Sequence, residues 1–412
     1  MATPWLLAGR HLRSHWLRSG LTMLSLTVAM FLFCLLISLV TSMEAAVSSA
    51  ATDRVIVQSK VSLFVALPKD YQSKIEQVPG VEACTKFQWF GGYYQKPENY
   101  MAQFGIDHGV FLDMYRKEMG VLPASAATQP AELAKLEPAD DARAAAVAAL
   151  AGDRRAAIVG EALMATYGWK VGDTVPITGT IFTKADGSAW DFNIVGVYRP
   201  LKSNVDPNTI FFRYDYLDEA LQAHAAIGPP GVGCYSVNVA AGHDPEAVIA
   251  ATDAIFSNGP QATLTTTEAA FQAGFLSMMG NLPFFIGTIG GAVVFAVVFS
   301  VINTMLMSGR QRLHETGILK ALGFTDGAVG RLMIGESLLL SLLGGGAGVL
   351  LAAVMDTGIK SVLGTMVPAY HMQPSTALLA LGVTAAIGIV AGVTPAIVAA
   401  RLRPTAALRS EG

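Results

Sequence analysis

Apolar residues gather along the chain in four long runs that polar side chains hardly interrupt. A helix that crosses a bilayer needs about 20 such residues, and each run is at least that long. Each run is therefore predicted to form a membrane-spanning helix. The runs are Ser19 to Met43, Ala269 to Gly309, Leu332 to Met355 with the single acid Glu336, and Ser361 to Ala400.

The second run is too long for one span. As a helix it would rise about 60 Å, about twice the hydrocarbon thickness of a bilayer. Pro283 is the predicted break, with a spanning section from about Pro283 to Met307 and a helix outside the membrane around Thr267 to Gly280. Residues Glu44 to Asp53 continue the first span outward, and the two extensions predict a helical stalk or an interfacial segment.

Between the first two spans the pattern changes to the alternation that is typical of strands. Two pieces share the order strand, helix, strand, and Pro68 or Asp244 with Pro245 marks each helix start. The first piece is DRVIVQSK, PKDYQSKIEQVPGVEA and CTKFQWFGGYYQ; the second is CYSVNVAA, HDPEAVIAATDAIFSN and QATLTTT. We expect one α+β lobe of about residues 54–110 plus 234–267, with a second lobe of about 111–233 inserted in it.

The insert begins with an Ala-rich, Pro-punctuated segment from Pro123 to Ala157. This composition is typical of a surface helix pair or a mobile excursion rather than core. A short helix and short strands follow, with a tight turn at Gly172 and Asp173. They predict a small barrel-like or sheet lobe.

Composition and charge add the orientation. The 412 residues are 52% hydrophobic and only 14% charged, which is too apolar for an ordinary soluble enzyme. The loop between the third and fourth spans has one basic residue, Lys360, so the positive-inside rule places both termini in the cytoplasm. Ten basic residues lie on that side: Arg10, Arg13, Arg18, Arg310, Arg312, Lys320, Arg331, Arg401, Arg403 and Arg409.

The segment from Glu44 to Glu268 then lies outside, and its 17 basic against 26 acidic residues exclude a nucleic-acid-binding domain. The first apolar run is about twice as long as that of a cleaved signal peptide, so it is expected to remain as a span. Residues 1–20 are expected to form an amphipathic helix at the membrane interface.

Motifs for catalysis are missing from the sequence. GxxxxGK[ST], GxSxG and HExxH do not occur, so the chain is not expected to hydrolyse ATP, to act as an enzyme, or to hold a metal or cofactor. Cys84 and Cys234 either form a disulfide or remain buried free thiols. Glu336 either serves an ion or proton path or caps a helix near Arg331.

The stretch RQRLHETGILKALGFTDGAVGRL between the second and third spans is patterned as a short amphipathic helix. Its apolar residues need a cover, and Gly323 is the predicted terminator. Such a helix either lies on the membrane or docks in a groove of another protein. The apolar residues are Ile318, Leu319, Ala321, Leu322 and Phe324.

The chain resembles the permease subunit of MacB/FtsX/LolC-type ABC transporters, also called type VII, in the split form without its own ATPase domain. The resemblance is carried by RLHETGILKALGFTDGAVGRLMIGESLLLSLLGGGAGVLLA, by AGRHLRSHWLRSGLTMLSLTVAM, by IVGEALMATYGWKVGDTV and by TPAIVAARLRPTAAL. It implies four transmembrane helices with a large extracytoplasmic α+β domain between helices 1 and 2.

The resemblance also implies partners. A separate ABC ATPase, which carries ATP and Mg²⁺, docks on a coupling helix, and two permease chains, identical or related, work as a dimer in the bacterial inner membrane. A periplasmic adaptor or outer-membrane partner fits the same family. The coupling-helix residues are Glu315, Gly317, Ile318, Leu319, Lys320, Ala321, Leu322, Gly323 and Phe324, with Lys320 expected to meet an acidic partner.

A Gly-rich stretch in the third span is expected to allow close helix packing. Its residues are Gly344, Gly345, Gly346 and Gly348.

Three functions stay open. An exporter moves its extracytoplasmic domain on ATP hydrolysis to expel a lipoprotein, peptide, drug or lipid; an FtsX-like regulator controls a cell-wall hydrolase; a membrane-anchored receptor has no ATPase. The predicted division is 1–20 amphipathic helix, 21–43 span 1, 44–280 extracytoplasmic domain with stalk, 281–309 span 2, 310–331 cytoplasmic loop, 332–358 span 3, 359–375 external loop, 376–400 span 4 and 401–412 cytoplasmic tail.

Overall fold

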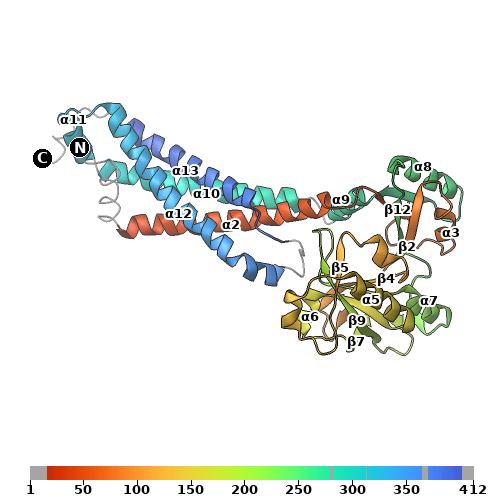
Figure 1. The fold of residues 1–412 in the computed structure, drawn as a ribbon. Coiled ribbons are helices and arrows are strands. Elements are labelled where there is room, and N and C mark those ends of the chain that lie inside the picture. Colours follow the sequence, from red (N-terminus) through yellow and green to blue (C-terminus); the bar gives the residue numbers. More distant parts are fainter. Residues whose placement is uncertain (1–15, 279–281, 312, 364–369, 401–412) are drawn as a thin grey trace. The chain divides into compact units, whose positions relative to one another are not determined.

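The computed structural model describes residues 16–278, 282–311, 313–363 and 370–400 (Figure 1). The chain divides into two compact units. The helical unit contains residues up to Met43, Asn281–Leu363 and the segment from Tyr370, and the mixed unit contains Glu44–Gly280. The expected amphipathic helix of residues 1–20 lies mostly outside the described residues, as do the tail 401–412 and part of the loop 359–375.

The helical unit is built from long apolar helices. Four of them are long and apolar enough to cross a membrane, at Ser19–Ser48, Pro283–Met307, Asp326–Lys360 and Pro374–Ala400, which confirms the four predicted spans. The helices are α2 (Trp16–Ser48), α10 (Leu282–Gln311), α11 (Leu313–Ala321), α12 (Asp326–Leu363) and α13 (Pro374–Ala400). The third span therefore begins at Asp326, six residues before the expected boundary.

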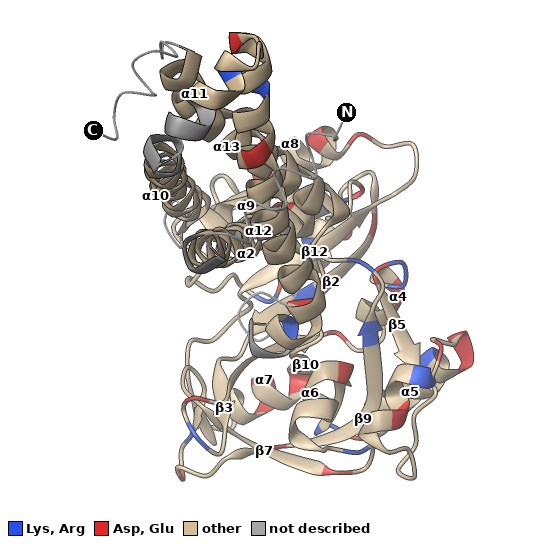
Figure 2. Cartoon of the chain, turned by 90° about the vertical axis from the view of Figure 1, so that its left-hand side faces the viewer, with Lys and Arg blue, Asp and Glu red and all other residues tan. Residues whose placement is uncertain are grey.

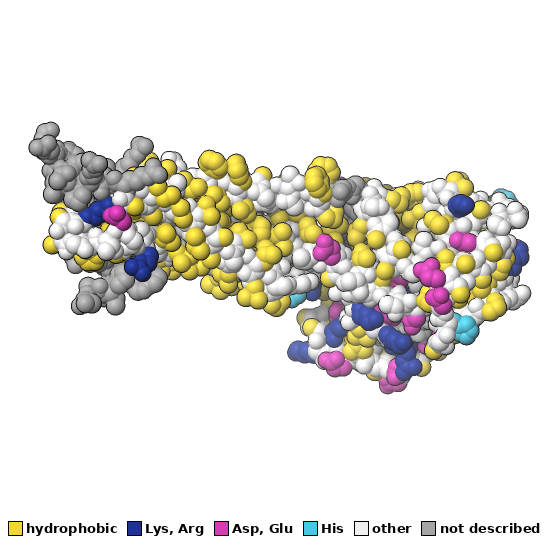
Figure 3. Space-filling model, turned by 90° about the horizontal axis from the view of Figure 1, so that it is seen from above, with side chains coloured by type: hydrophobic (Ala, Val, Ile, Leu, Met, Phe, Trp, Pro, Cys, Tyr) yellow, Lys and Arg dark blue, Asp and Glu magenta, His cyan; other side chains and the backbone are white. Residues whose placement is uncertain are grey.

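Exposed apolar side chains cover the flank of the helical unit (Figure 3). Phe295, Phe299 and Leu378 are each more than half exposed. In water such a surface would be costly, whereas hydrocarbon covers it without penalty. The helical unit therefore has the surface of a multi-pass membrane protein.

Pro283 lies in the first turn of α10, and the helix before it, α9 (Glu268–Met278), belongs to the mixed unit. Proline is tolerated in a first turn because the backbone N–H that it lacks has no partner inside the helix there. Two separate helices therefore replace the single long apolar run, as the position of the proline predicts.

One eleven-stranded sheet runs through the mixed unit, in the order β10-β6-β9-β7-β3-β4-β2-β12-β1-β13, with β5 paired to β9 and a small β8–β11 sheet beside it. The strands are β1 (Arg54–Ser59), β2 (Val81–Trp89), β3 (Gly92–Tyr94), β4 (Tyr100–Ile106), β5 (Met119–Leu122), β6 (Ala156–Gly160), β7 (Thr174–Gly179), β8 (Thr183–Lys184), β9 (Trp190–Pro200), β10 (Thr209–Arg213), β11 (Ala226–Ile227), β12 (Cys234–Val239) and β13 (Thr263–Thr267). The helices are α3 (Tyr71–Ile75), α4 (Phe111–Met114), η1 (Pro130–Lys135), α5 (Asp140–Gly152), α6 (Glu161–Tyr167), α7 (Tyr214–Gln222), α8 (Pro245–Phe256) and α9.

The first lobe consists of the antiparallel strands β2, β12, β1 and β13 with α3 and α8. Both predicted strand, helix, strand pieces are present, and Asp244 caps α8 by accepting the backbone N–H of Glu246 at 3.1 Å. The rings of Tyr71 and Phe256 stack with centroids 3.9 Å apart and join the two helices over the sheet. The halves thus share one core although about 150 residues separate them.

The second lobe is a closed barrel. Strand β10 pairs with β6 on one side and in parallel with β4 on the other, which closes the ring β4-β3-β7-β9-β6-β10. Phe90 occupies its interior, with Trp190, Phe192 and Phe212 in edge-to-face contact around it. Such contacts stabilise an aromatic core beyond simple area burial. The predicted barrel-like lobe is therefore present.

The boundary of this lobe differs from the expected residue 111. Strands β3 and β4 lie before it and belong to the barrel, and β4 also pairs with β2 of the first lobe. Because β4 has neighbours in both lobes, the sheet continues from one lobe to the other. The two lobes share a strand and are not joined only by loops.

The Ala-rich segment forms a helix pair at the surface, as expected, but one face of the pair belongs to the core, contrary to expectation. It forms η1 and α5, and one face of these helices is buried through Leu133, Ala146 and Leu150. Arg143 lies on the same face and donates to the carbonyls of Leu112 and Met119, each at 3.4 Å. The small alanine side chains let α5 lie close to the barrel strands.

Cys84 and Cys234 are buried free thiols on the adjacent strands β2 and β12. Cys84 lies opposite Val237 in the strand register, and Cys234 lies opposite Phe87. Side chains alternate between the two faces of a sheet, so the three-residue offset places the cysteines on opposite faces. A disulfide between them does not fit this register.

Candidate docking helix and transmission junction

The predicted coupling segment forms the short helix α11 between α10 and α12. Gly323 follows it with a φ of 93°, and its N–H donates to the carbonyl of Lys320 at 3.0 Å. The N–H of Phe324 donates to the carbonyl of Leu319 at 3.1 Å. Glycine adopts this left-handed conformation without strain, which explains why the helix ends here.

An apolar surface remains at the end of α11 and in the turn after it, formed by Ile318, Leu322 and Phe324, which we call the α11 apolar surface. All three side chains are exposed, and Leu322 is 72% exposed. Ile318 and Leu322 are four residues apart and share one side of the helix. Leu319 is half-buried, Gly317 is buried, and Ala321 and Gly323 are exposed. The side chain of Glu315 lies outside the described residues.

Lys320 is held within the chain. Its ammonium group lies 2.8 Å from the carboxylate of Asp326 and donates to the carbonyl of Ala400 at 3.0 Å, and the side chain is only 6% exposed. We expected Lys320 to meet an acid of a partner, but its contacts instead connect α11 to the start of α12 and the end of α13. Figure 2 shows positions of both charges near α11, whereas most of the length of the spans carries no charged residue.

Three of the four predicted packing glycines lie at close helix contacts. Gly344 and Gly348 face α2, where the hydroxyl of Thr27 donates to the Gly344 carbonyl at 2.9 Å, and Gly345 faces Thr384 of α13. A side chain on Gly346 would meet nothing within 4 Å. The glycines at contact permit helix backbones to approach closely.

Two further packing glycines were missed in the sequence. Gly388 and Gly392 of α13 lie against the backbone of Leu338 and Ile334 of α12. Their four-residue spacing matches the small-xxx-small pattern of close membrane helices. This signal was available in the stretch GIVAG.

Arg54 is the centre of a buried polar cluster in the mixed unit. Its guanidinium lies 3.2 Å from the Glu268 carboxylate and 3.5 Å from that of Glu118. Glu268 also accepts the backbone N–H of Ala51 at 3.0 Å. Ala51 follows α2 and Glu268 begins α9, which precedes α10. Both connections to the spans therefore meet at this cluster of Ala51, Arg54, Glu118 and Glu268, which we call the transmission junction.

Arg54 also contacts both lobes. It donates to the side-chain oxygen of Asn238 on β12 at 3.0 Å and to the carbonyl of Met114 at 2.8 Å, and it lies over the ring of Tyr115 at 3.9 Å. Asn238 belongs to the first lobe, and Met114 and Tyr115 precede β5. One side chain therefore contacts both lobes and both connections to the spans.

The electrostatics of the junction follow from its burial. Arg54, Glu118 and Glu268 are only 2%, 3% and 7% exposed. Burial raises the pKa of Glu268, and Arg54 opposes this shift only in part. Burial alone lowers the pKa of Arg54, but Tyr115, Glu268 and Glu118 raise it above its ordinary value. The arginine thus remains charged and supplies the countercharge that the buried carboxylates require.

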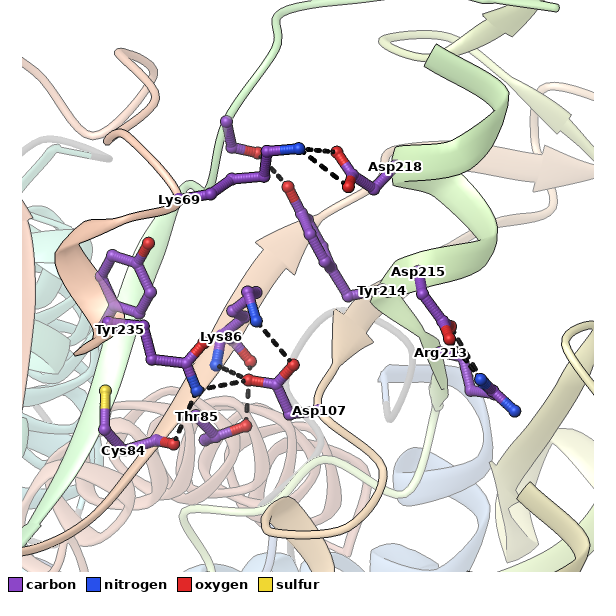
Figure 4. Close-up of polar contacts among 12 residues, drawn as sticks. Lys69, Cys84, Thr85, Lys86, Asp107, Arg213, Tyr214, Asp215, Asp218 and Tyr235 are labelled. Atoms are coloured by element: carbon purple, nitrogen blue, oxygen red, sulfur yellow. Dashed lines mark hydrogen bonds and ion pairs between the residues drawn. The ribbon is translucent and has the colours of Figure 1, made fainter. Parts of the chain in front are cut away.

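A second set of polar contacts joins the lobes near α3 and α7 (Figure 4). Lys86 of β2 lies 2.9 Å from the carboxylate of Asp107, which also accepts the Lys86 backbone N–H at 2.9 Å. Lys69, before α3, bonds Asp218 of α7 through both carboxylate oxygens at 2.9 Å. This second seam is more exposed than the junction, and the two sets leave the lobes connected at two places.

The charged groups of the junction and of the second seam make ion pairs and hydrogen bonds that join parts of the fold, and their arrangement does not indicate a catalytic site. Within the described ranges, no cluster of three or more His, Cys, Asp and Glu side chains is placed to hold a metal ion. Nothing in the sequence singles out the junction, because Arg54 and Glu268 are ordinary charged residues at the border of a strand. Their meeting depends on pairing between β1 and β13 across more than 200 residues.

Comparison with known proteins identifies the family. The model of a MacB-like periplasmic core domain matches residues 19–255, and that of an FtsX-like permease C-terminal region matches residues 287–404. The pyoverdine export ATP-binding/permease protein PvdT of Pseudomonas savastanoi pv. phaseolicola is 34% identical over 157 residues, which are 37% of this chain and 23% of PvdT. The macrolide export ATP-binding/permease protein MacB of Sodalis glossinidius is 35% identical over 136 residues, 33% of this chain and 19% of that protein.

Solved structures also resemble the chain, at low sequence identity. The periplasmic region of MacB from Actinobacillus actinomycetemcomitans has a TM-score of 0.36 and 10% identity, covering 57% of this chain and 96% of that one. The extracellular domain of the transporter YknZ has a TM-score of 0.35 and 11% identity, covering 52% and 100%. The matches to PvdT and MacB span less than a quarter of those relatives. Because one family model covers more than half of its residues and a second covers most of the remaining spans, the chain belongs to the MacB/FtsX family of ABC-type permeases.

Proposed function

We propose that the chain is the permease subunit of an ABC exporter in the bacterial inner membrane, driven by ATP hydrolysis on a separate ATPase subunit. The observation that carries the proposal is the α11 apolar surface. Ile318, Leu322 and Phe324 are exposed at the end of a short helix and in the turn after it, in the basic, cytoplasmic part of the chain, and such a surface suits a groove of another protein. The printed names of the relatives, export ATP-binding/permease proteins, support the same assignment.

The contacts around α11 support transmission of force. Lys320 fixes α11 to α12 through Asp326 and to α13 through Ala400. A displacement of α11 by a docked ATPase therefore acts on two spans together. At the other end of the spans, α2 and α10 lead to the transmission junction, where one arginine contacts both lobes. In this proposal two permease chains form a dimer, and ATP-driven movement reaches the mixed unit on the outer side.

The test is co-purification of the tagged chain with the ATPase encoded beside it. Leu322→Asp places a charge in the proposed desolvated contact, where it costs several kcal/mol. We expect the retained ATPase and its ATP turnover to fall at least tenfold. Leu264→Asp is the matched control, since Leu264 is also exposed but lies on β13, and it should retain the wild-type amount.

Two outcomes would reject parts of the proposal. If Leu322→Asp and Leu264→Asp retain the ATPase equally, α11 is not the docking site. If wild type retains no ATPase at all, the membrane-anchored receptor becomes the better interpretation.

A further inference from the structure

The mixed unit contains a cavity of about 350 Å³ on the face of β2 and β12 that points away from α3 and α8. Phe87 and Cys234, which are opposite each other in the strand register, both line it. Further walls come from β4, from the loop before α3 and from α9. Six aromatic side chains line the cavity: Phe64, Phe87, Trp89, Phe104, Phe271 and Phe275.

Gln88 and Asp206 at the cavity wall already have partners inside the protein, whereas the buried indole N–H of Trp89 has no hydrogen-bond partner among the described residues. The Gln88 amide donates to the carbonyl of Trp89 at 2.8 Å, and its oxygen accepts the N–H of Gly233 at 2.6 Å. The carboxylate of Asp206 accepts the backbone N–H of Asn208 at 2.7 Å. A polar ligand would have to break these bonds, whereas an apolar ligand would only displace water. The chemistry of the wall therefore selects an apolar ligand.

The cavity opens through apolar side chains. Phe64 at its mouth is 65% exposed, and Ile181 and Phe275 are also exposed. Aromatic side chains at an open mouth lower their free energy when an apolar molecule covers them. The mouth and the interior thus favour the same class of ligand.

One wall of the cavity is joined to the membrane span by a short length of chain. Phe271 and Phe275 lie one turn apart on α9, and the ring of Phe275 contacts that of Trp89 edge-on with centroids 6.4 Å apart. The span begins at Pro283, eight residues after Phe275. Only eight residues therefore separate this wall from the start of a membrane span. The bilayer is a possible source of a ligand that can move from lipid into a protein cavity.

We propose that this cavity binds a single acyl chain, so that a lipid or a lipid-modified molecule is the substrate class of the permease. The volume is at the small end of the range for ligand pockets, about 300–1,000 Å³, and suits one slender chain better than a bulky ring system. The proposal rests on the proposed export function only in calling the bound molecule a substrate. Binding itself requires no ATPase.

The test uses the full chain in nanodiscs of phosphatidylethanolamine and phosphatidylglycerol, without ATPase. Palmitic acid with a photoreactive diazirine group is the probe, and labelled peptides are identified by mass spectrometry. We expect labelling in residues 60–66 and in α9, displaced by unlabelled fatty acids from octanoic to palmitic acid. Each added methylene should improve displacement about threefold to fourfold until the cavity is full.

Ala102→Phe is the blocking variant, because Ala102 lines the cavity on β4. It should lower labelling of both peptides at least fivefold. Ile227→Phe is the matched control, since Ile227 is exposed on β11 and is not among the cavity residues. Should Ala102→Phe not fold, as judged by its thermal melting, Ala66→Phe at the loop wall serves instead.

A second arm separates the two sources of the chain. In it the photoreactive group is on an acyl chain of the nanodisc phospholipid. Labelling by this phospholipid identifies the bilayer as the source, and labelling by the free acid alone identifies a chain delivered with a cargo; both support the proposal. Labels that map away from the cavity, or that Ala102→Phe leaves unchanged, overturn it. Because no ATPase is present, loss of docking at α11 cannot produce that result.

Discussion

Arg54 satisfies groups from several separate elements with one planar side chain. An arginine suits this position because it has five donors in a fixed geometry and keeps its charge when buried. Glu118 and Glu268 need that charge, since a carboxylate without a countercharge is costly inside a protein. Because Arg54 and the two carboxylates are buried, loss of the arginine or of a carboxylate should lower the stability of the fold.

We expect Arg54→Met to lower the free energy of unfolding by about 3–5 kcal/mol, because the buried Glu268 carboxylate loses its countercharge and the buried Glu118 carboxylate keeps only Lys202, at 3.7 Å. Arg154→Met is the matched control: its ion pair with Glu219 is largely exposed and should change stability by at most about 1 kcal/mol. Urea unfolding of the full chain in detergent, followed by tryptophan fluorescence, measures both. Equal effects of the two substitutions would contradict the structural role of Arg54.

Asp206 gives a prediction on pH dependence. Burial raises the pKa of its carboxyl from 3.8 to about 6, although Asn208 and Thr209 hydrogen bonds oppose the shift. The folded state therefore binds a proton more tightly than the unfolded state, so the contribution to stability is full below about pH 4 and is lost as the pH rises through 6. Asp206→Asn removes this dependence.

At pH 7.5 the variant should be more stable than wild type, by at most about 3 kcal/mol for a pKa shift of about two units. Near pH 4 the two proteins should be equally stable. Thermal melting across this pH range measures the difference. A gain of the same size at both pH values would show that ionisation of Asp206 is not the cause.

At the scale of single helices, the glycines of α12 have unequal surroundings. A side chain at Gly348 would meet the Thr27 carbonyl and the Met30 side chain of α2, whereas one at Gly346 would meet open space. Glycine is also a poor helix former, by about 1 kcal/mol relative to alanine. A Gly→Ala substitution should therefore lower the stability of the protein at position 348 and leave it unchanged or raise it at position 346.

Gly348→Ala should therefore lower the melting temperature of the chain in detergent, because α2 must move away to admit the new methyl group. Gly346→Ala, with the same chemistry, should leave it unchanged or raise it slightly. If both variants melt at the same temperature, the contact between α12 and α2 is looser than the structure shows.

The elements that could be predicted from the sequence are those that local features of the sequence determine. Four spans and the break at Pro283 follow from apolar runs and proline geometry, which are local properties. The shared strand β4 and the core role of α5 are not local: β4 pairs with β10, more than a hundred residues away, and α5 packs on the separate strands β5, β6 and β9. Alanine carries no pattern that distinguishes a fully exposed helix face from one packed on a sheet, so the prediction for residues 123–157 anticipated the helix pair but not its buried face.

The candidate site shows the same division. The end of α11 at Gly323 and its exposed apolar residues could be predicted from one short stretch. The pairing of Lys320 with Asp326 could not, because an isolated lysine in a sequence does not reveal whether its partner is in the same chain. The transmission junction had no sequence signal, as its two carboxylates are 150 residues apart.

For the whole molecule, the proposed orientation places α11 and the mixed unit on opposite sides of the membrane. Leu322→Cys and Ile227→Cys test it, since both residues are exposed and the native Cys34, Cys84 and Cys234 are buried and should react slowly. In intact spheroplasts a membrane-impermeant maleimide should label Ile227→Cys, and label Leu322→Cys only after lysis. Labelling of both variants without lysis in sealed spheroplasts would refute this topology.

The central position of β1 has a consequence for biogenesis. Its neighbours β12 and β13 are made late, and Arg54 meets Asn238 across 184 residues. At about 5–20 residues per second a ribosome needs roughly 10–40 seconds to synthesise that interval. In the proposed orientation, the VIV segment of β1 waits outside the membrane during that time with both edges unpaired, a state prone to aggregation. An extracytoplasmic holdase chaperone would then raise the yield of the folded permease, and the need for it would grow at low translation rates.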